Sequence, residues 1–134
     1  MSEDELVALA AQARGNAYVP YSKFAVDAAL MTKSGRVFTG CNIENVSLGL
    51  TMCAERVAVG GALSNGETEF DAIAIVASSK RLAIPCGACR QVLAEFNPTL
   101  KVVTSTTSGE RETLNLRSLL PNPKQGILES FRDV

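Results

Sequence analysis

The chain has 134 residues, of which 46% are hydrophobic and 20% charged, and this is typical of one soluble globular domain spanning residues 1–134. Thirteen basic and fourteen acidic residues give a net charge of −1, without the basic stripe that a nucleic-acid surface needs. The sequence contains no histidine, which excludes histidine-based catalytic triads and metal sites with histidine ligands.

Local signals delimit nine elements along the chain. Ser2 and Glu5 form a capping box, and Gly15 is expected to end the helix that begins there. Ser34-Gly35 separates two β-type runs at hairpin spacing, and Asn115 can cap a last short helix. The tail to position 134 has room for one more helix. The predicted elements are helix 3–14, strands 26–32 and 36–41, helix 51–65, strand 72–77, helix 86–96, strands 100–104 and 111–114, and a short helix from 116.

The order of these elements indicates the fold class. The run 72–77 is continuously apolar, which is typical of a strand buried on both faces. Strands alternate with helices of suitable length, which favours a single mixed sheet covered by helices on both sides. The sequence therefore predicts an α/β fold with three layers, α/β/α, around five strands.

The N-terminus and the apolar runs predict a cytoplasmic protein. The first five residues include three acidic ones, where a secretory leader would be basic. No apolar run approaches the roughly 20 residues that cross a bilayer, so we expect no membrane contact. The four cysteines, at positions 41, 53, 86 and 89, are expected to be reduced or bound to a metal rather than paired in disulfides.

Three of these cysteines lie at the starts of predicted helices. Cys53 lies in one first turn, and Cys86 and Cys89 lie in another. Free backbone N–H groups and the helix dipole favour thiolates at such positions. The two-residue spacing of Cys86 and Cys89 lets both sulfurs reach one metal ion. Three thiolates leave one tetrahedral position open, as in catalytic zinc sites.

Glu55, two residues after Cys53, completes a known pattern. Zinc deaminases combine a ligand, one residue, a glutamate and then Pro-Cys-x-x-Cys. Cys53-Ala54-Glu55 with Pro85-Cys86-Gly87-Ala88-Cys89 matches it, with cysteine as the first ligand. The pattern predicts one Zn²⁺ per subunit on Cys53, Cys86 and Cys89, with Glu55 as the catalytic residue that moves the proton.

Other interpretations of the cysteines stay open at this point. A lone Cys-x-x-Cys also occurs in redox dithiols, although that leaves Cys53 and Glu55 without a role. A closed structural zinc site would need Cys41 as its fourth ligand; otherwise Cys41 is a buried free cysteine in a strand. Both describe a non-catalytic module in which Glu55 is dispensable.

Four segments, in this order, carry a resemblance to a known family. They are Tyr18-Val19-Pro20-Tyr21-Ser22-Lys23-Phe24, Gly40-Cys41-Asn42-Ile43-Glu44-Asn45, Cys53-Ala54-Glu55-Arg56 and Pro85-Cys86-Gly87-Ala88-Cys89-Arg90-Gln91-Val92. From about Tyr18 to Pro121 the chain resembles the cytidine deaminase family, in its small, homotetrameric, three-cysteine branch. The resemblance implies the fold of the cytidine deaminase family and a homotetramer. It also implies hydrolytic deamination of cytidine or deoxycytidine in pyrimidine salvage. Since no basic groove for a strand is visible, a free nucleoside is the expected substrate.

The resemblance also implies roles for residues near the predicted metal site. Asn42 and Glu44 would hold the ribose 3′-hydroxyl. Phe24 would pack against the pyrimidine, and the main chain of Ala54 would contact the base. Taken alone, Asn42 and Glu44 also fit a solvated loop, and Phe24 also fits a core position.

Arg56 has a role that follows from the charge of three thiolates. They would give the zinc complex a net charge of −1, and a guanidinium that donates to the sulfurs withdraws part of it. The resemblance assigns this role to Arg56, with Arg90 assisting. The alternative for both is an arginine on a helix surface.

Three departures from the family pattern concern substrate recognition. Asp27 stands where relatives usually have glycine, and Leu48 where a tyrosine usually reaches a neighbouring subunit's pocket. After Pro121 the usual Gly-Ala-Phe segment is missing, which leaves Phe131 as the candidate ring over the base. The departures keep open a deaminase of another aminated heterocycle, such as a blasticidin-type or modified nucleoside, with Asp27 meeting a cationic group.

Overall fold

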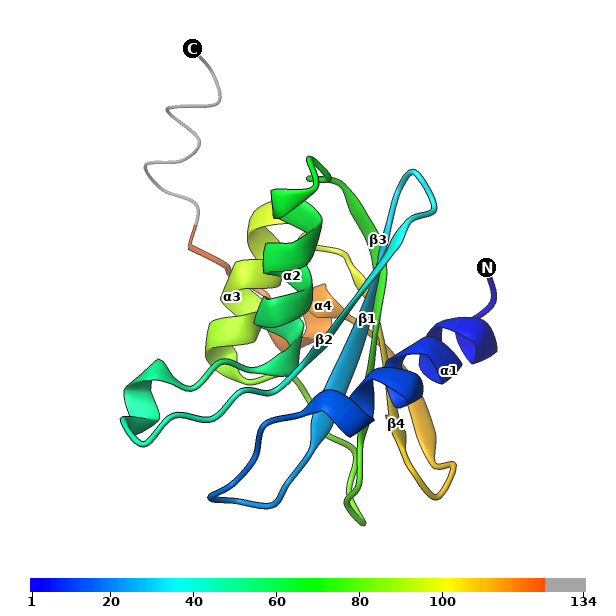
Figure 1. The fold of residues 1–134 in the computed structure, drawn as a ribbon. Coiled ribbons are helices and arrows are strands. Elements are labelled where there is room, and N and C mark those ends of the chain that lie inside the picture. Colours follow the sequence, from blue (N-terminus) through cyan, green and yellow to red (C-terminus); the bar gives the residue numbers. More distant parts are fainter. Residues whose placement is uncertain (125–134) are drawn as a thin grey trace.

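The computed structural model describes residues 1–124, and its elements follow the predicted order (Figure 1). The helices are α1 (Glu3–Ala13), α2 (Ala54–Ser64), α3 (Gly87–Phe96) and α4 (Leu116–Leu119), with 3₁₀ turns η1 (Arg14–Asn16) and η2 (Leu48–Leu50). The strands are β1 (Val26–Thr32), β2 (Val37–Cys41), β3 (Phe70–Ala77), β4 (Lys101–Thr106) and β5 (Arg111–Asn115). The further helix expected in the tail lies outside the described residues. Within those residues, none of the helices has the length and apolar character needed to cross a membrane.

The five strands form one mixed sheet in the order β2-β1-β3-β4-β5. Strands β3 and β4 run parallel, and every other neighbouring pair is antiparallel. Figure 1 shows α1 on one face of the sheet and α2 and α3 on the other. The predicted three-layer α/β fold is therefore confirmed.

Alternation along β1 divides the core between the two faces of the sheet. Ala28 and Leu30 belong to a cluster that includes residues of α2, α3 and α4, whereas Ala29 belongs to a cluster formed with α1. Successive side chains of a strand point to opposite faces. Asp27, which is fully buried, therefore lies on the α1 face together with Ala29. Helices α2 and α3, whose starts carry the predicted metal ligands, pack on the other face.

The two helices that begin at the cysteine pattern start slightly later than predicted. Met52 exchanges two main-chain hydrogen bonds of 2.9 Å with Ile43, so the chain stays extended up to Cys53. Cys53 is the N-cap of α2, and Cys86 is the N-cap of α3. The backbone before each helix thus presents a cysteine at the positive end of a helix dipole.

Two predicted helix caps are confirmed. The hydroxyl of Ser2 accepts the N–H of Glu5 at 3.2 Å, and Oδ1 of Asn115 accepts the N–H of Arg117 at 3.0 Å. Helix α1 ends at Ala13, slightly before the predicted stop, because the chain tightens into the turn η1. Local capping chemistry therefore accounts for the starts of α1 and α4.

Gly40 in β2 sets how closely the sheet approaches α2. A Cβ at this position would overlap the main-chain oxygen of Ala54 and lie 2.6 Å from the nitrogen of Ala58. Because both neighbours are backbone atoms, no side-chain movement relieves the clash. We expect Gly40→Ala to lower the free energy of unfolding by about 1–3 kcal/mol in denaturant titrations.

A matched control lies in the same helix. Gly60 of α2 is exposed, and a Cβ there has no heavy atom within 4 Å among the described residues. Gly60→Ala should raise the free energy of unfolding by about 0.5–1 kcal/mol, because alanine favours helix. Equal stability of Gly40→Ala and the parent protein would contradict the close approach of β2 and α2.

Candidate active site

Three cysteine sulfurs converge where α2 and α3 begin. Cys53 and Cys86 are the two N-caps, and Cys89 lies in the first turn of α3. Their Sγ atoms all lie within 4.8 Å of one another, and those of Cys53 and Cys86 are 4.0 Å apart. Zn–S bonds of about 2.3 Å place the sulfurs of a tetrahedral site roughly 3.8 Å apart. The group therefore fits one zinc ion.

Cys41 lies apart from this group. It is paired with Asp27 across β1 and β2, and cross-strand partners share a face, so its side chain lies on the α1 side of the sheet. Within residues 1–124, the cluster of possible metal ligands consists of Cys53, Cys86 and Cys89. A closed structural zinc site with Cys41 as the fourth ligand is therefore not supported.

The surroundings of the sulfurs favour thiolate at Cys53. A hydrogen bond from Cys89 is the main cause that lowers the pKa of Cys53 to about 5. Arg56 adds to it, because its Nη2 donates to the Cys53 sulfur at 3.3 Å. The same shared hydrogen bond raises the pKa of Cys89. At Cys41, by contrast, burial raises the pKa of the thiol, and the thiolate is the form that binds metals.

Glu55 is buried beside the sulfurs. It is the second residue of α2, and only 5% of it is exposed. Burial raises the pKa of its carboxyl, and the nearby charge of Cys53 raises it further. A buried carboxyl with a raised pKa is the kind of group that acts as a general acid and base.

A cavity of about 250 Å³ opens over Glu55 and two of the cysteines, Cys53 and Cys86. It is lined by Phe24, Val26, Asn42, Thr51, Met52, Cys53, Ala54, Glu55, Ile75, Ala83, Ile84 and Cys86. Most of this lining is apolar, and within residues 1–124 no lysine or arginine contributes to it. The cavity therefore suits a small, largely apolar ring, and among the described residues its lining offers no basic side chain to a phosphate group.

Comparison with known proteins gives the family of this site. A family model described as the cytidine and deoxycytidylate deaminase zinc-binding region matches residues 1–106. The chain belongs to this deaminase family. The zinc cofactor and the hydrolytic deaminase chemistry predicted from the cysteine and glutamate pattern are thereby confirmed. The redox and non-catalytic interpretations are set aside.

Individual relatives cover nearly the whole chain. A cytidine deaminase from Halalkalibacterium halodurans is 50% identical over 122 residues, which are 90% of this chain and 92% of the relative. The crystal structure of cytidine deaminase from Burkholderia pseudomallei matches with a TM-score of 0.89 and 46% identity, covering 92% of this chain and 100% of that chain. A blasticidin-S deaminase from Bacillus cereus is 32% identical over 108 residues, 75% of this chain and 76% of the relative. The predicted deaminase fold is confirmed by these matches.

Several residues that the resemblance to this deaminase family singled out meet at the cavity. Phe24, Asn42 and Ala54 all line it. Glu44 lies outside the lining, two residues beyond Asn42, on the same face of an extended segment. Its carboxylate accepts main-chain N–H groups of Tyr21 and Ser22, each at 3.1 Å. The sequence alone did not indicate these contacts.

The two arginines of the deaminase pattern have different surroundings. Arg56 donates to the Cys53 sulfur, as expected for a residue that withdraws charge from the thiolates. The guanidinium of Arg90 instead donates to the carbonyl oxygens of Pro85 and Leu119, at 2.7 and 3.0 Å. These contacts place Arg90 in support of the segment before Cys86 rather than on the sulfurs.

Two of the departures from the deaminase pattern, Asp27 and Leu48, do not line the cavity. Asp27 is buried on the opposite face of the sheet, so the structure does not support its pairing with a cationic substrate. Leu48 is 78% exposed in η2 and is not among the residues that line the cavity. Phe131 lies outside the described residues.

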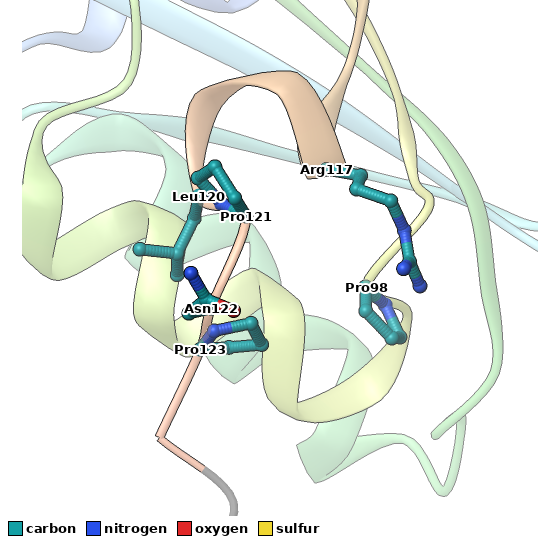
Figure 2. Close-up of a pocket in the computed structure, with 6 residues that line it drawn as sticks. All are labelled: Pro98, Arg117, Leu120, Pro121, Asn122 and Pro123. Carbon is teal, nitrogen blue, oxygen red and sulfur yellow. The ribbon is translucent and has the colours of Figure 1, made fainter.

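A second hollow, of about 200 Å³, lies beyond the end of α4. Figure 2 shows Pro98 and Arg117 on one side of it and Leu120, Pro121, Asn122 and Pro123 on the other. It shares no residue with the lining of the first cavity, and the cysteine group does not reach it. Asn122 and Pro123, which stand where the usual family segment is missing, thus line a surface feature separate from the first cavity.

Proposed function

We propose that this protein deaminates free cytidine and deoxycytidine by hydrolysis, giving uridine or deoxyuridine and ammonia, within a single domain. The observation that carries the proposal is a buried glutamate beside three converging cysteines at one end of a small, largely apolar cavity. The relative from Halalkalibacterium halodurans, named a cytidine deaminase, supports this choice of substrate.

Cys53, Cys86 and Cys89 would hold the zinc ion, one per subunit. Thiolates are ligands that zinc prefers, and the distances among the three sulfurs agree with one tetrahedral site. Arg56 would offset part of the negative charge on these sulfurs. When bound, zinc acts as a Lewis acid and lowers the pKa of water toward about 7.

Glu55 would move the protons of the reaction. Its carboxylate takes a proton from the attacking water and gives it to the ring nitrogen N3. A C4–O bond forms, and Glu55 then takes the proton of the new C4 hydroxyl and passes it to the amino group. The C4–N bond breaks as the C4 carbonyl forms, and the amino group leaves as ammonia. Burial raises the pKa of Glu55, which favours the protonated form that gives its proton to the ring nitrogen.

Four further residues would bind the nucleoside. Phe24, at the cavity rim, would pack against the pyrimidine, and the main chain of Ala54 would contact the base. Asn42 and Glu44 would hold the ribose 3′-hydroxyl. Since no basic side chain lines the cavity within residues 1–124, a nucleoside fits better than its phosphate ester or a nucleic acid strand.

A homotetramer in the cytoplasm, serving pyrimidine salvage, is the proposed setting. Large apolar side chains of one loop are exposed next to the cavity: Ile43, Val46, Leu48, Leu50 and Met52. Several large apolar side chains exposed on one loop favour an interface with another protein chain. The four free cysteines agree with a reducing compartment. Light scattering coupled to size exclusion tests the assembly.

Ammonia release by the zinc-loaded protein tests the proposed substrate. The panel is cytidine, deoxycytidine, deoxycytidylate and blasticidin S. We expect turnover of both nucleosides and a lower kcat/KM for deoxycytidylate, because its phosphate would meet no basic partner in the cavity. Turnover of blasticidin S without turnover of either nucleoside would overturn the proposal.

A further inference from the structure

We propose that Ser22 is a positioning residue for the nucleoside, acting through the carboxylate of Glu44. The inference rests on the proposed function, because it concerns the side of the cavity that would take the sugar. Ser22 itself lies outside the cavity lining, so its influence passes through the groups that it holds.

Ser22 forms hydrogen bonds through both its main chain and its side chain. Its N–H donates to Oε1 of Glu44 at 3.1 Å, and its hydroxyl donates to Oε2 of the same carboxylate. The hydroxyl also accepts the N–H of Phe24 at 3.0 Å. One side chain therefore joins the proposed sugar acceptor to a residue that lines the cavity.

The Glu44 carboxylate can accept one further hydrogen bond at Oε2, the oxygen that accepts the Ser22 hydroxyl. Oε1 already accepts two bonds, from the N–H groups of Tyr21 and Ser22. Each carboxylate oxygen offers about two acceptor sites, so Oε1 is saturated and Oε2 keeps one for a substrate hydroxyl. The Ser22 hydroxyl fixes the direction in which that free site points.

The turn around Ser22 is held in an uncommon conformation. Lys23 has φ 59°, in the left-handed region that residues other than glycine rarely adopt. Its N–H donates to the oxygen of Val19 at 3.1 Å. Such a conformation persists only where the surrounding contacts enforce it, and the bond from Phe24 to the Ser22 hydroxyl is one of them.

Asn42 anchors the other end of the same segment. Its Nδ2 donates to the oxygen of Phe24 at 2.8 Å, and its Oδ1 accepts the N–H of Val26 at 3.0 Å. Hydrogen bonds thus join residues 21–26 to the neighbouring extended segment, through Asn42 at one end and through Glu44 at the other. The hydroxyl of Ser22 provides one of the bonds to Glu44.

The charge state of Glu44 agrees with this arrangement. The hydrogen bond from the Ser22 hydroxyl is the main cause that lowers the pKa of Glu44, and Lys23 contributes through its charge. A carboxylate is a hydrogen-bond acceptor only, which suits a partner for a sugar hydroxyl.

The test compares Ser22→Ala with two other variants. Ser22→Thr keeps the hydroxyl, so its KM for cytidine should stay close to that of the parent protein. Ser34→Ala is the matched control, because Ser34 also donates to a glutamate, Oε1 of Glu67 at 2.8 Å, but lies outside the cavity lining. The measurements are kcat and KM for cytidine and for 3′-deoxycytidine, together with Tm.

For Ser22→Ala we expect the KM for cytidine to rise about tenfold, with kcat changed less than about threefold. With 3′-deoxycytidine, which lacks the hydroxyl that Glu44 would accept, the rise in KM should disappear. Ser34→Ala should leave KM unchanged for both substrates, whatever its effect on Tm.

Two results would overturn the role of Ser22 and leave the proposed function standing. They are an unchanged KM for cytidine in Ser22→Ala, and an equal rise in KM for both substrates. The second result would mean that loss of the hydroxyl disturbs the cavity in general. If the parent protein does not turn over cytidine, the proposed function itself fails, and this inference fails with it.

Discussion

Replacing Glu55 by glutamine is expected to lower kcat for cytidine by about 10²–10⁴-fold, the usual contribution of a general acid–base group. The amide cannot take a proton from water and return it to the ring. It has nearly the same size as the carboxyl, so the buried site and its metal content should persist. Ammonia release and zinc content by atomic absorption, measured on the same samples, check both parts.

The same substitution is expected to leave the protein at least as stable. Because burial raises the pKa of Glu55, its protonated form favours the folded state in acid, and this contribution is lost as the pH rises through the folded-state pKa. Glutamine carries no charge at any pH, so its Tm at pH 7 should equal or exceed that of the parent. Glu112→Gln, on the exposed strand β5, is the control and should keep full activity. Near-normal turnover in Glu55→Gln would show that another group moves the proton.

Cys53→Ser is expected to remove zinc and activity together. A hydrogen bond from Cys89, together with Arg56, lowers the pKa of Cys53 to about 5 and so favours the thiolate that binds zinc. Loss of a partner outside the ligand set usually costs 10–100-fold in metal affinity or activity, and loss of a ligand should cost more than about 100-fold. Zinc content after dialysis, and the Tm with and without a chelator, measure the effect.

Cys41→Ser provides the matched control for this experiment. Cys41 lies on the α1 face of the sheet, away from the other three cysteines. The variant should keep its zinc and its turnover. Loss of zinc in Cys41→Ser, or full retention in Cys53→Ser, would contradict the assignment of the three ligands.

The features that the sequence predicted best depend on residues close together in the chain. The capping serine of α1, the hairpin between β1 and β2, and the Cys86–Cys89 spacing are all local, and each appears as predicted. The convergence of Cys53 with the other two cysteines needed one further step, since the pattern of a known chemistry links positions 33 residues apart.

Features set by long-range packing could not be predicted in the same way. The face on which Asp27 lies depends on the register of β1 in the whole sheet, and its side chain points away from the cavity. The contact of Ser22 with Glu44 spans 22 residues, and that of Arg90 with Leu119 spans 29. Residue types at these positions do not specify a partner, because a polar loop or a helix arginine has many alternatives.

The three sulfurs join two helix starts that are separated in the chain by the whole of β3. An ion held there acts as a cross-link that closes a long loop, and cross-links of this kind restrict the unfolded chain. The metal would therefore stabilise the layer that α2 and α3 form on one face of the sheet, in addition to supplying chemistry. A preparation only partly loaded with zinc should melt in two separate transitions, whose relative areas report the fraction of loaded molecules.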